Sequence, residues 1–110
     1  MKHDHIRLSA LLAQDQQASR LHTRHLLALR TVCEHWRPLS VHALAALIDA
    51  TPSTTSRTAD RLVAEGLLTR TDNPDDRRVA LLEPTQAGRD LNARIARYLL
   101  ATDPPREAAA

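Results

Sequence analysis

The histidines and the single cysteine are the residues of this sequence that most readily suggest metal or redox chemistry. Most of them fall in short pairs: His3 and His5, His22 and His25, and Cys33 and His35. A structural metal site needs such ligands at a recurring spacing, and the sequence contains no HxxxH or CxxC element. We therefore expect no metal site and no cofactor, and we interpret these histidines as solvated or helix-capping residues.

Catalytic chemistry is also not indicated. Cys33 lies on the apolar stripe of a predicted helix, which favours a core thiol over a redox sensor, because a buried thiol without a cationic neighbour is unreactive. The sequence has no glycine-rich phosphate loop, no defensible pair of catalytic carboxylates and no nucleophile–base pair. We expect a protein that is not an enzyme.

Arginines and short hydroxyl residues between positions 53 and 78 indicate a different chemistry. Arg57 and Arg61 are four residues apart, so they share one side of a helix, and Arg77 and Arg78 follow an acidic turn. Arginine can bridge O6 and N7 of guanine or hold a phosphate, and short side chains let a helix approach DNA closely. The same composition is also typical of a solvated helix face. The positions of these residues, and not their types alone, therefore have to distinguish DNA contact from simple solvation.

Hydrophobic periodicity predicts the helices that would position these residues. Apolar side chains recur at intervals of three and four over residues 4–19, 22–36, 41–48, 52–65 and 85–101. The boundaries are marked by caps and prolines. Pro38 ends the second helix and Ser40 is the expected N-cap of the third. Thr51 is the expected N-cap of the fourth helix, Pro52 occupies its first position, and Gly66 closes it.

After Gly66 the pattern changes to that of a β-hairpin. Residues 67–71 and 77–83 read as two short strands, and residues 72–76 between them are a dense turn signal. Pro84 ends the second strand, and Thr85 is the expected cap of the last helix. Two helices joined by a tight turn and followed by a hairpin form the order of a winged helix-turn-helix. In that fold the second of the two helices enters the major groove of DNA.

The composition agrees with a mostly α fold with a minor β component. Ala and Leu number 18 each among 110 residues, whereas there are 2 glycines and no phenylalanine, which argues against a β-sandwich or barrel. The apolar runs are too short to span a membrane and the N-terminus lacks a signal-peptide pattern, so we expect a cytoplasmic protein. Arg outnumbers Lys 14 to 1, which together with the alanine content suggests a bacterial genome rich in G and C.

Charge and aromatic content narrow the choice of partner. The net charge of +2 permits a nucleic-acid partner without requiring one. Trp36 and Tyr98 are the only residues of the Phe, Trp and Tyr class, so a platform that stacks single-stranded bases is not expected. We expect Trp36, at the end of the second helix, to pack at the hinge that follows it.

Four segments between residues 39 and 91 stand out by their order and spacing: TPSTTSR, ADRLVAEGLL, NPDDRR and PTQAGRDL. With them, residues 39–91 resemble the DNA-binding core of the MarR family of bacterial regulators. The resemblance implies a winged helix-turn-helix protein with a two-stranded hairpin wing and flanking N- and C-terminal helices. It also implies a transcriptional regulator that binds double-stranded DNA. Relatives often bind aromatic acids, but no motif marks such a pocket here, so a small-molecule effector stays unassigned.

The resemblance also implies roles for individual residues. The groove-facing positions of the recognition helix are Ser53, Thr54, Ser56, Arg57 and Arg61. Arg77 and Arg78 occupy the paired wing arginines, one of which typically reaches the minor groove in the family. Asp60 stands where the family has an acid that pairs with a wing arginine and fixes the wing against the helix.

The sequence departs from the family pattern at three positions and in its length. Asp49 replaces the usual glycine of the turn, and Asp tolerates the left-handed region better than most residues. Ala50 and Thr55 are smaller or more polar than the usual aliphatic residues, so we expect loose packing between the two helices. From the residues that follow the last predicted helix, we expect no further C-terminal helix of the kind that interlocks two subunits in the family.

Without that helix, we expect a homodimer formed by the first and last helices. The apolar residues that exceed the needs of a small core are Ile6, Leu8, Leu11, Leu12, Leu91, Ile95, Tyr98 and Leu99. We expect one domain over residues 1–102, with its reading head at about 39–84, and a disordered tail over 103–110.

Two other functions use the same fold. A winged helix can serve as a protein–protein interaction module, with arginines that only increase solubility, or as the domain of a plasmid replication or partition factor. Salt dependence separates groove binding from an apolar interface, because only contacts to phosphates weaken steeply with salt.

Overall fold

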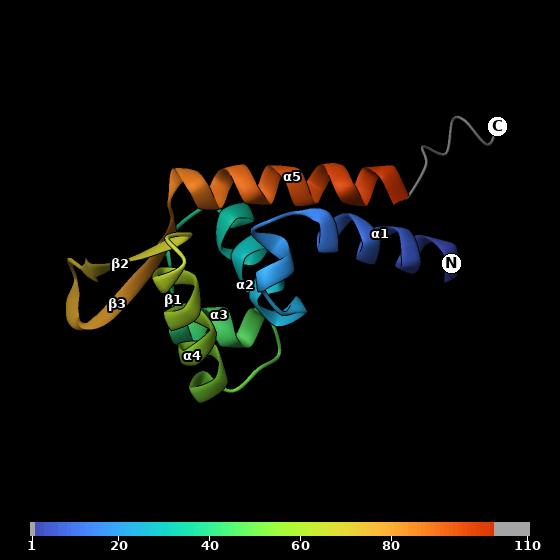
Figure 1. Ribbon diagram of the computed structural model, residues 1–110. Helices are drawn as coiled ribbons and strands as arrows, with labels where there is room; N and C mark the ends of the chain where they lie inside the picture. Colours follow the sequence, from blue (N-terminus) through green and yellow to red (C-terminus); the bar gives the residue numbers. More distant parts are fainter. Residues whose placement is uncertain (1, 103–110) are drawn as a thin grey trace.

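The computed structural model describes residues 2–102 of the chain, and the side chains of residues 7–101. The predicted tail at 103–110 and the predicted interface side chain of Ile6 lie outside these ranges. The elements in chain order are α1 (Lys2–Gln14), the 3-10 turn η1 (Ala18–Arg20), α2 (Thr23–Glu34), β1 (Leu39–Ser40), α3 (Val41–Leu47), α4 (Pro52–Ala64), β2 (Leu68–Asn73), β3 (Asp76–Pro84) and α5 (Gln86–Thr102). The predicted mostly α, winged-helix architecture is confirmed (Figure 1).

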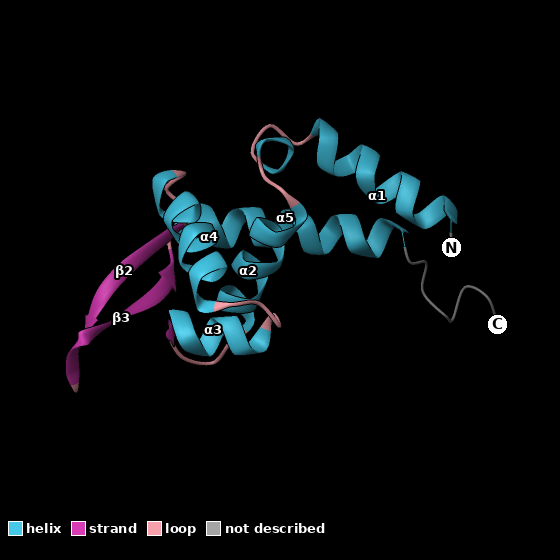
Figure 2. Cartoon of the chain, turned by 90° about the horizontal axis from the view of Figure 1, so that it is seen from below, coloured by secondary structure: helices cyan, strands magenta, loops and turns pink. Residues whose placement is uncertain are grey.

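The helices form two groups. Helices α1 and α5 run side by side at one side of the molecule, whereas α3, α4 and the hairpin lie at the other, with α2 between them (Figures 1 and 2). None of the helices within residues 2–102 is long and apolar enough to cross a membrane.

The first helix is shorter than the predicted 4–19, because the chain leaves α1 after Gln14. The Asp15 carboxylate accepts hydrogen bonds from the backbone N–H groups of Gln17 at 2.9 Å and Ala18 at 3.0 Å. Satisfying these two amides starts η1 as a separate turn, since an acidic side chain at such a position competes with continuation of the helix.

The sheet has three strands in the order β1-β3-β2, all antiparallel. The prediction of a two-stranded hairpin therefore missed β1, in which Leu39 is opposite Leu82 and Ser40 is opposite Leu81. A strand of two residues is too short to show alternation in the sequence. The wing strands also extend closer to the turn than the predicted 67–71 and 77–83.

The predicted caps and turns are confirmed. The hydroxyl of Ser40 accepts a hydrogen bond from the backbone N–H of Ala43, and that of Thr51 accepts one from Thr54. Asp49 has a φ of 54° and Gly66 a φ of 74°, so both residues lie in the left-handed region, as expected. The helix-turn-helix is thus formed by local interactions that the sequence specifies.

The core is built mainly from leucine side chains of α2, α3, α4, α5 and the three strands, and Leu12 of α1 packs against it. Its fully buried members include Leu29, Leu44, Leu62, Leu82 and Leu91. The core also contains a buried threonine of α4. The side chain of Thr55 is 0% exposed, and its hydroxyl has no hydrogen-bond partner within the described residues.

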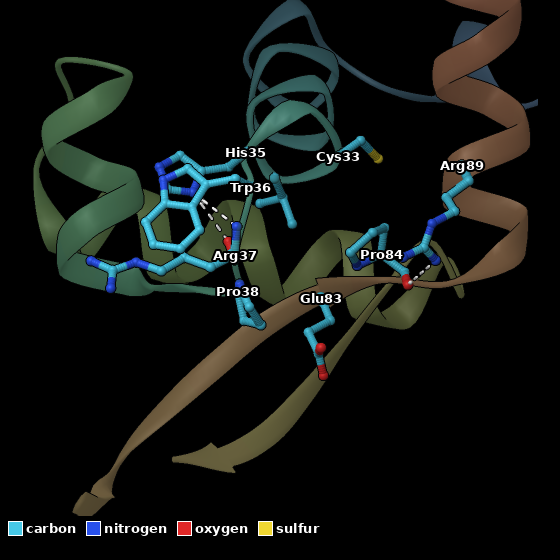
Figure 3. Close-up of a pocket in the computed structure, with 9 residues that line it drawn as sticks. Cys33, His35, Trp36, Arg37, Pro38, Glu83, Pro84 and Arg89 are labelled. Atoms are coloured by element: carbon cyan, nitrogen blue, oxygen red, sulfur yellow. Dashed lines mark hydrogen bonds between the residues drawn. The ribbon is translucent and has the colours of Figure 1, made fainter. Parts of the chain in front are cut away.

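Trp36 does not pack at the hinge as predicted. It is 80% exposed, stacks on His35, and lies under the guanidinium of Arg37, which is 4.7 Å from the ring centroid. Trp36, Cys33 and Arg89 are among the residues that line a cleft of about 230 Å³. Figure 3 shows Trp36 and Arg89 on opposite sides of it. Burial raises the pKa of the Cys33 thiol to about 11, despite the opposing effect of Arg89, so the thiol stays protonated near neutral pH, as expected for a structural cysteine.

Candidate nucleic-acid interface

Helix α4 presents a polar surface along its N-terminal half. Ser53, Thr54 and Arg57 are exposed, and Ser56 is half-buried, whereas Thr55 faces the core. The cap formed by Thr51 and the proline at the first helical position start the helix here, so the exposed hydroxyl residues occupy its first two turns. Short side chains at this end leave room for another molecule to approach the helix axis.

The two arginines predicted on this helix have different surroundings. Arg57 is exposed and makes no hydrogen bond or ion pair within the described part of the chain. Arg61, in the last turn, donates a hydrogen bond to the carbonyl oxygen of Arg20 at 2.7 Å, and its Nε lies 3.3 Å from the carboxylate of Glu65. Their spacing predicted one exposed face for both arginines, but Arg61 is bound by other residues of the chain and Arg57 is not.

Strand β3 carries the other two predicted arginines, Arg77 and Arg78, close to the tip of the wing. The tip is closed by Asn73, whose side chain accepts a hydrogen bond from the backbone N–H of Asp75 at 2.9 Å. Arg77 is exposed and has no partner among the described residues, and the side chain of Arg78 is 90% exposed. The guanidinium of Arg78 contacts the carboxylate of Asp76 at 3.0 Å, and this contact lowers the pKa of that acid.

The wing is attached to α4 by an ion pair. Oδ1 of Asp60 lies 2.6 Å from the guanidinium of Arg70 on β2, which also donates a longer hydrogen bond, 3.4 Å, to the carbonyl oxygen of Ser56. Asp60 thus does pair with an arginine of the wing strands, but that arginine is Arg70. Neither of the predicted wing arginines, Arg77 and Arg78, is the partner of Asp60.

A cleft of about 270 Å³ lies between the start of α3, α4 and the wing. It is lined by residues of all three elements, among them His42, Ser56, Arg70 and Arg78. His42 and Arg70 were not predicted as site residues. A lone histidine one residue into a short helix and an arginine on an exposed strand carry no distinctive spacing, so only their convergence reveals them.

The predicted interface residues whose side chains the structure describes divide into two groups. Leu91 and Ile95 are 0% and 4% exposed, so they belong to the core of the single chain and their assignment to a subunit interface is corrected. The physical reason is that α5 packs on both α1 and α2, which cover that face of the helix. The remaining described side chains are half-buried or exposed: Leu8, Leu11, Leu12, Tyr98 and Leu99.

Tyr98 is held within its own chain. Its hydroxyl donates a hydrogen bond to the carboxylate of Asp15, which also accepts one from Nε of Arg94 at 2.9 Å. This contact draws its ring toward α1 of the same chain. At the C-terminal end of α5, Leu100 is 72% exposed.

No group of three histidine, cysteine, aspartate or glutamate side chains comes together as a metal site in the part of the chain that the structure describes. His22 and His25, the pair that shares a helix face, interact through the backbone N–H of His22, which donates to Nδ1 of His25 at 3.1 Å. Burial, with the nearby charges of Arg24 and Arg61, lowers the pKa of His25, so its ring is neutral near pH 7.

A helix-turn-helix whose second helix is exposed at its N-terminal half, with an anchored β-hairpin beside it, defines a winged-helix DNA-binding protein. A sequence profile of the MarR family matches residues 23–80, more than half of the chain, and the chain belongs to this family. It is therefore a DNA-binding transcription regulator of the MarR class. No curated protein matches the sequence.

Several solved structures are similar to this chain. YusO from Bacillus subtilis is 25% identical with a TM-score of 0.74, over 88% of this chain and 68% of that one. A MarR-family transcriptional regulator from Rhodococcus sp. RHA1 is also 25% identical, with a TM-score of 0.70, over 86% of this chain and 66% of that one. FabT of Streptococcus pneumoniae, solved in complex with DNA, shares the fold at 16% identity and a TM-score of 0.78, over 89% of this chain and 68% of its own.

Proposed function

We propose that the protein binds specific sequences of double-stranded DNA with α4 in the major groove and the β2–β3 wing at the minor groove. The observation that carries this proposal is the ion pair between Asp60 and Arg70, 2.6 Å long, which anchors the hairpin beside the exposed half of α4. Two elements held in this way can reach adjacent grooves of one duplex. The reading head would span residues 39–84.

The proposed contacts divide into those that read bases and those that hold the backbone. Arg57 has an exposed guanidinium without an internal partner, so it is the proposed base-reading residue, with short hydroxyl residues beside it for close approach. Arg77 and Arg78 on the wing are proposed to contribute affinity through phosphates or the minor groove. The other proposed contacts on α4 are those of Ser53, Thr54 and Ser56.

We further propose that two copies act together on an inverted repeat. A single winged helix offers roughly 600–1,000 Å² to DNA, which is too little for tight specific binding. The exposed Leu100 and the half-exposed Leu99 at the C-terminal end of α5, with Leu8 and Leu11 of α1, are the proposed contacts between subunits. Such a regulator would act in the cytoplasm by binding DNA, without catalysing a reaction.

Selection of bound sequences from random duplex DNA by the purified protein tests this function. We expect a two-fold symmetric motif with half-sites about 34 Å apart, one helical turn. Arg57→Gln should lose about 1–3 kcal/mol of binding free energy and relax the preference at one base pair. Arg97→Gln, which removes an exposed arginine of α5, is the matched control and should bind normally.

The wing is tested by salt dependence. Arg77→Gln and Arg78→Gln should weaken binding to all sequences and lower the slope of log K against log salt by about one unit each. Unchanged slopes in both variants would remove the wing from the interface. No enrichment of any duplex by the wild-type protein, together with a protein partner whose binding ignores salt, would favour the interaction-module hypothesis instead.

A further inference from the structure

The C-terminal end of α4 is bound to the η1 turn by a closed set of polar contacts. The guanidinium of Arg61 donates to the carbonyl oxygen of Arg20 at 2.7 Å and contacts the carboxylate of Glu65 at 3.3 Å. The other oxygen of Glu65 accepts from the guanidinium of Arg20 at 3.0 Å. Arg61 of α4 and Glu65, the C-cap of that helix, thus hold both the backbone and the side chain of Arg20 in η1.

The opposite end of η1 is bound to α5. The side chain of Asp15, only 5% exposed, accepts from the backbone N–H groups that begin the turn and from Nε of Arg94 at 2.9 Å. It also accepts from the hydroxyl of Tyr98, and Arg94 donates a further hydrogen bond to the side chain of Gln17. Burial alone would raise the pKa of Asp15, but these donors together hold it far below its usual range, so the carboxylate stays charged.

These contacts form a continuous chain from α4 through η1 to α5. Its ends lie in the two groups of helices that Figure 1 separates: the reading head with α4 and the wing, and the pair α1 and α5. The partners are far apart in sequence: Arg20 and Arg61 are 41 positions apart, and Asp15 and Arg94 are 79 positions apart. We call this set of residues, Asp15, Arg20, Arg61, Glu65 and Arg94, the η1 strut.

We propose that Arg61 is a positioning residue, which sets the orientation of α4 relative to α1 and α5 through the η1 strut instead of contacting DNA. Two of its guanidinium nitrogens are engaged by the protein, whereas the guanidinium of Arg57, one turn earlier, has no internal partner. This inference rests on the proposed function, in which α4 reads DNA and the subunits meet through α1 and α5. In such a dimer the strut determines the distance between the two recognition helices.

The test compares Arg61→Gln with Arg57→Gln on the motif selected by the wild-type protein. For Arg61→Gln we expect unchanged base preferences and single half-site affinity within about threefold. Binding to the full repeat should fall about tenfold, and repeats lengthened or shortened by one base pair should bind as well as the optimal one. Arg61→Lys, which keeps one donor for the Arg20 carbonyl, should recover part of the loss. Arg57→Gln should instead alter the preference at a base pair.

Two results would overturn the proposal. A loss of preference at one base pair in Arg61→Gln would show that this residue reads DNA. Undiminished binding of the full repeat, with its spacing preference intact, would show that the strut does not position α4.

Amide hydrogen exchange supplies a readout that does not depend on DNA. The backbone N–H groups of Ala18, Ser19 and Leu21 donate within the turn, to Asp15 or to the carbonyl of Ala18. We expect Arg61→Gln and Asp15→Asn each to accelerate exchange at these three amides, whereas Arg57→Gln should not. A wild-type protein that fails to bind any duplex would count against the proposed function, while the exchange of these amides would still decide whether Arg61 holds η1. Unchanged exchange in Arg61→Gln would overturn the strut.

Discussion

At the scale of single residues, Thr55 is a site where the sequence is not optimal for stability. Its hydroxyl is buried on the core face of α4 without a hydrogen-bond partner among the described residues, and such a group costs about 1–3 kcal/mol. Thr55→Val replaces the hydroxyl with a methyl group of similar size and keeps the β-branch. We expect a gain of roughly 1 kcal/mol in the free energy of unfolding, measured by urea denaturation.

The matched control for this prediction is Thr58→Val. Thr58 is also buried, but its hydroxyl donates to the carbonyl oxygen of Thr54 at 3.0 Å, so its removal should not stabilise the protein. If both variants had the same effect, the unpaired hydroxyl of Thr55 would not be the cause.

At the scale of elements, the wing depends on the contact between Asp60 and Arg70. Asp60→Asn keeps the shape of the side chain but removes the charge that orients Arg70, so we expect weaker DNA binding by about threefold to tenfold. The side chains are 61% and 36% exposed, so screening by water keeps the effect on folding stability small. Binding to a selected duplex and thermal unfolding would separate the two effects.

The charge reversal provides the control for this prediction. Asp60→Arg combined with Arg70→Asp restores an opposite-charge pair across the same two positions, and we expect it to bind better than either single variant. Equal affinities of the double variant and the worse single variant would mean that the pair does not hold the wing.

The junction of α1 with α5 should make stability depend on pH. Because the donors around Asp15 hold its pKa far below the ordinary value of about 3.9, this carboxylate stabilises the fold at pH values above about 4, and the contribution is lost as pH falls further. We expect Asp15→Asn to lower the free energy of unfolding by roughly 2 kcal/mol near pH 7 and to flatten the decline between pH 4 and pH 2.

His25 also makes the free energy of unfolding fall as pH falls, but at higher pH than Asp15 does. Its pKa is lowered by burial and by the charges of Arg24 and Arg61, so the unfolded chain binds a proton before the folded one does as pH falls below about 6.5. Stability curves measured for the wild type and Asp15→Asn from pH 8 to pH 2 separate the two groups. A variant curve parallel to that of the wild type below pH 4 would contradict the role of Asp15.

At the scale of the whole molecule, the proposed binding to an inverted repeat requires that two chains associate. Leu100 is 72% exposed at the end of α5, and Leu100→Asp should convert a dimer to a monomer if that end lies in the interface. Leu27→Asp, at a 49% exposed leucine of α2, is the matched control and should leave the dimer intact. Sedimentation equilibrium at about 10–100 μM measures both, and a monomeric wild type would contradict the dimer.

Elements with local signals could be predicted from the amino-acid sequence. Ser40 and Thr51 cap the helices that follow them, Gly66 ends α4, and Asp49 takes the left-handed conformation of the turn. Each of these interactions joins residues no more than a few positions apart, so residue type and spacing are sufficient to predict it. The order of helices and hairpin, and with it the winged-helix architecture, followed from the same local signals.

The partners of side chains that make contacts between distant parts of the chain depend on the tertiary structure and could not be predicted. Asp60 pairs with Arg70 of the wing and not with Arg77 or Arg78. Ile95 lies in the core of the chain and not on a surface that another subunit could cover. Gly88 is a further case, because a Cβ atom there would lie 2.1 Å from the carbonyl oxygen of Leu67. Periodicity gives the face of a helix on which a residue lies, but what covers that face depends on packing between distant elements, and no local pattern records it.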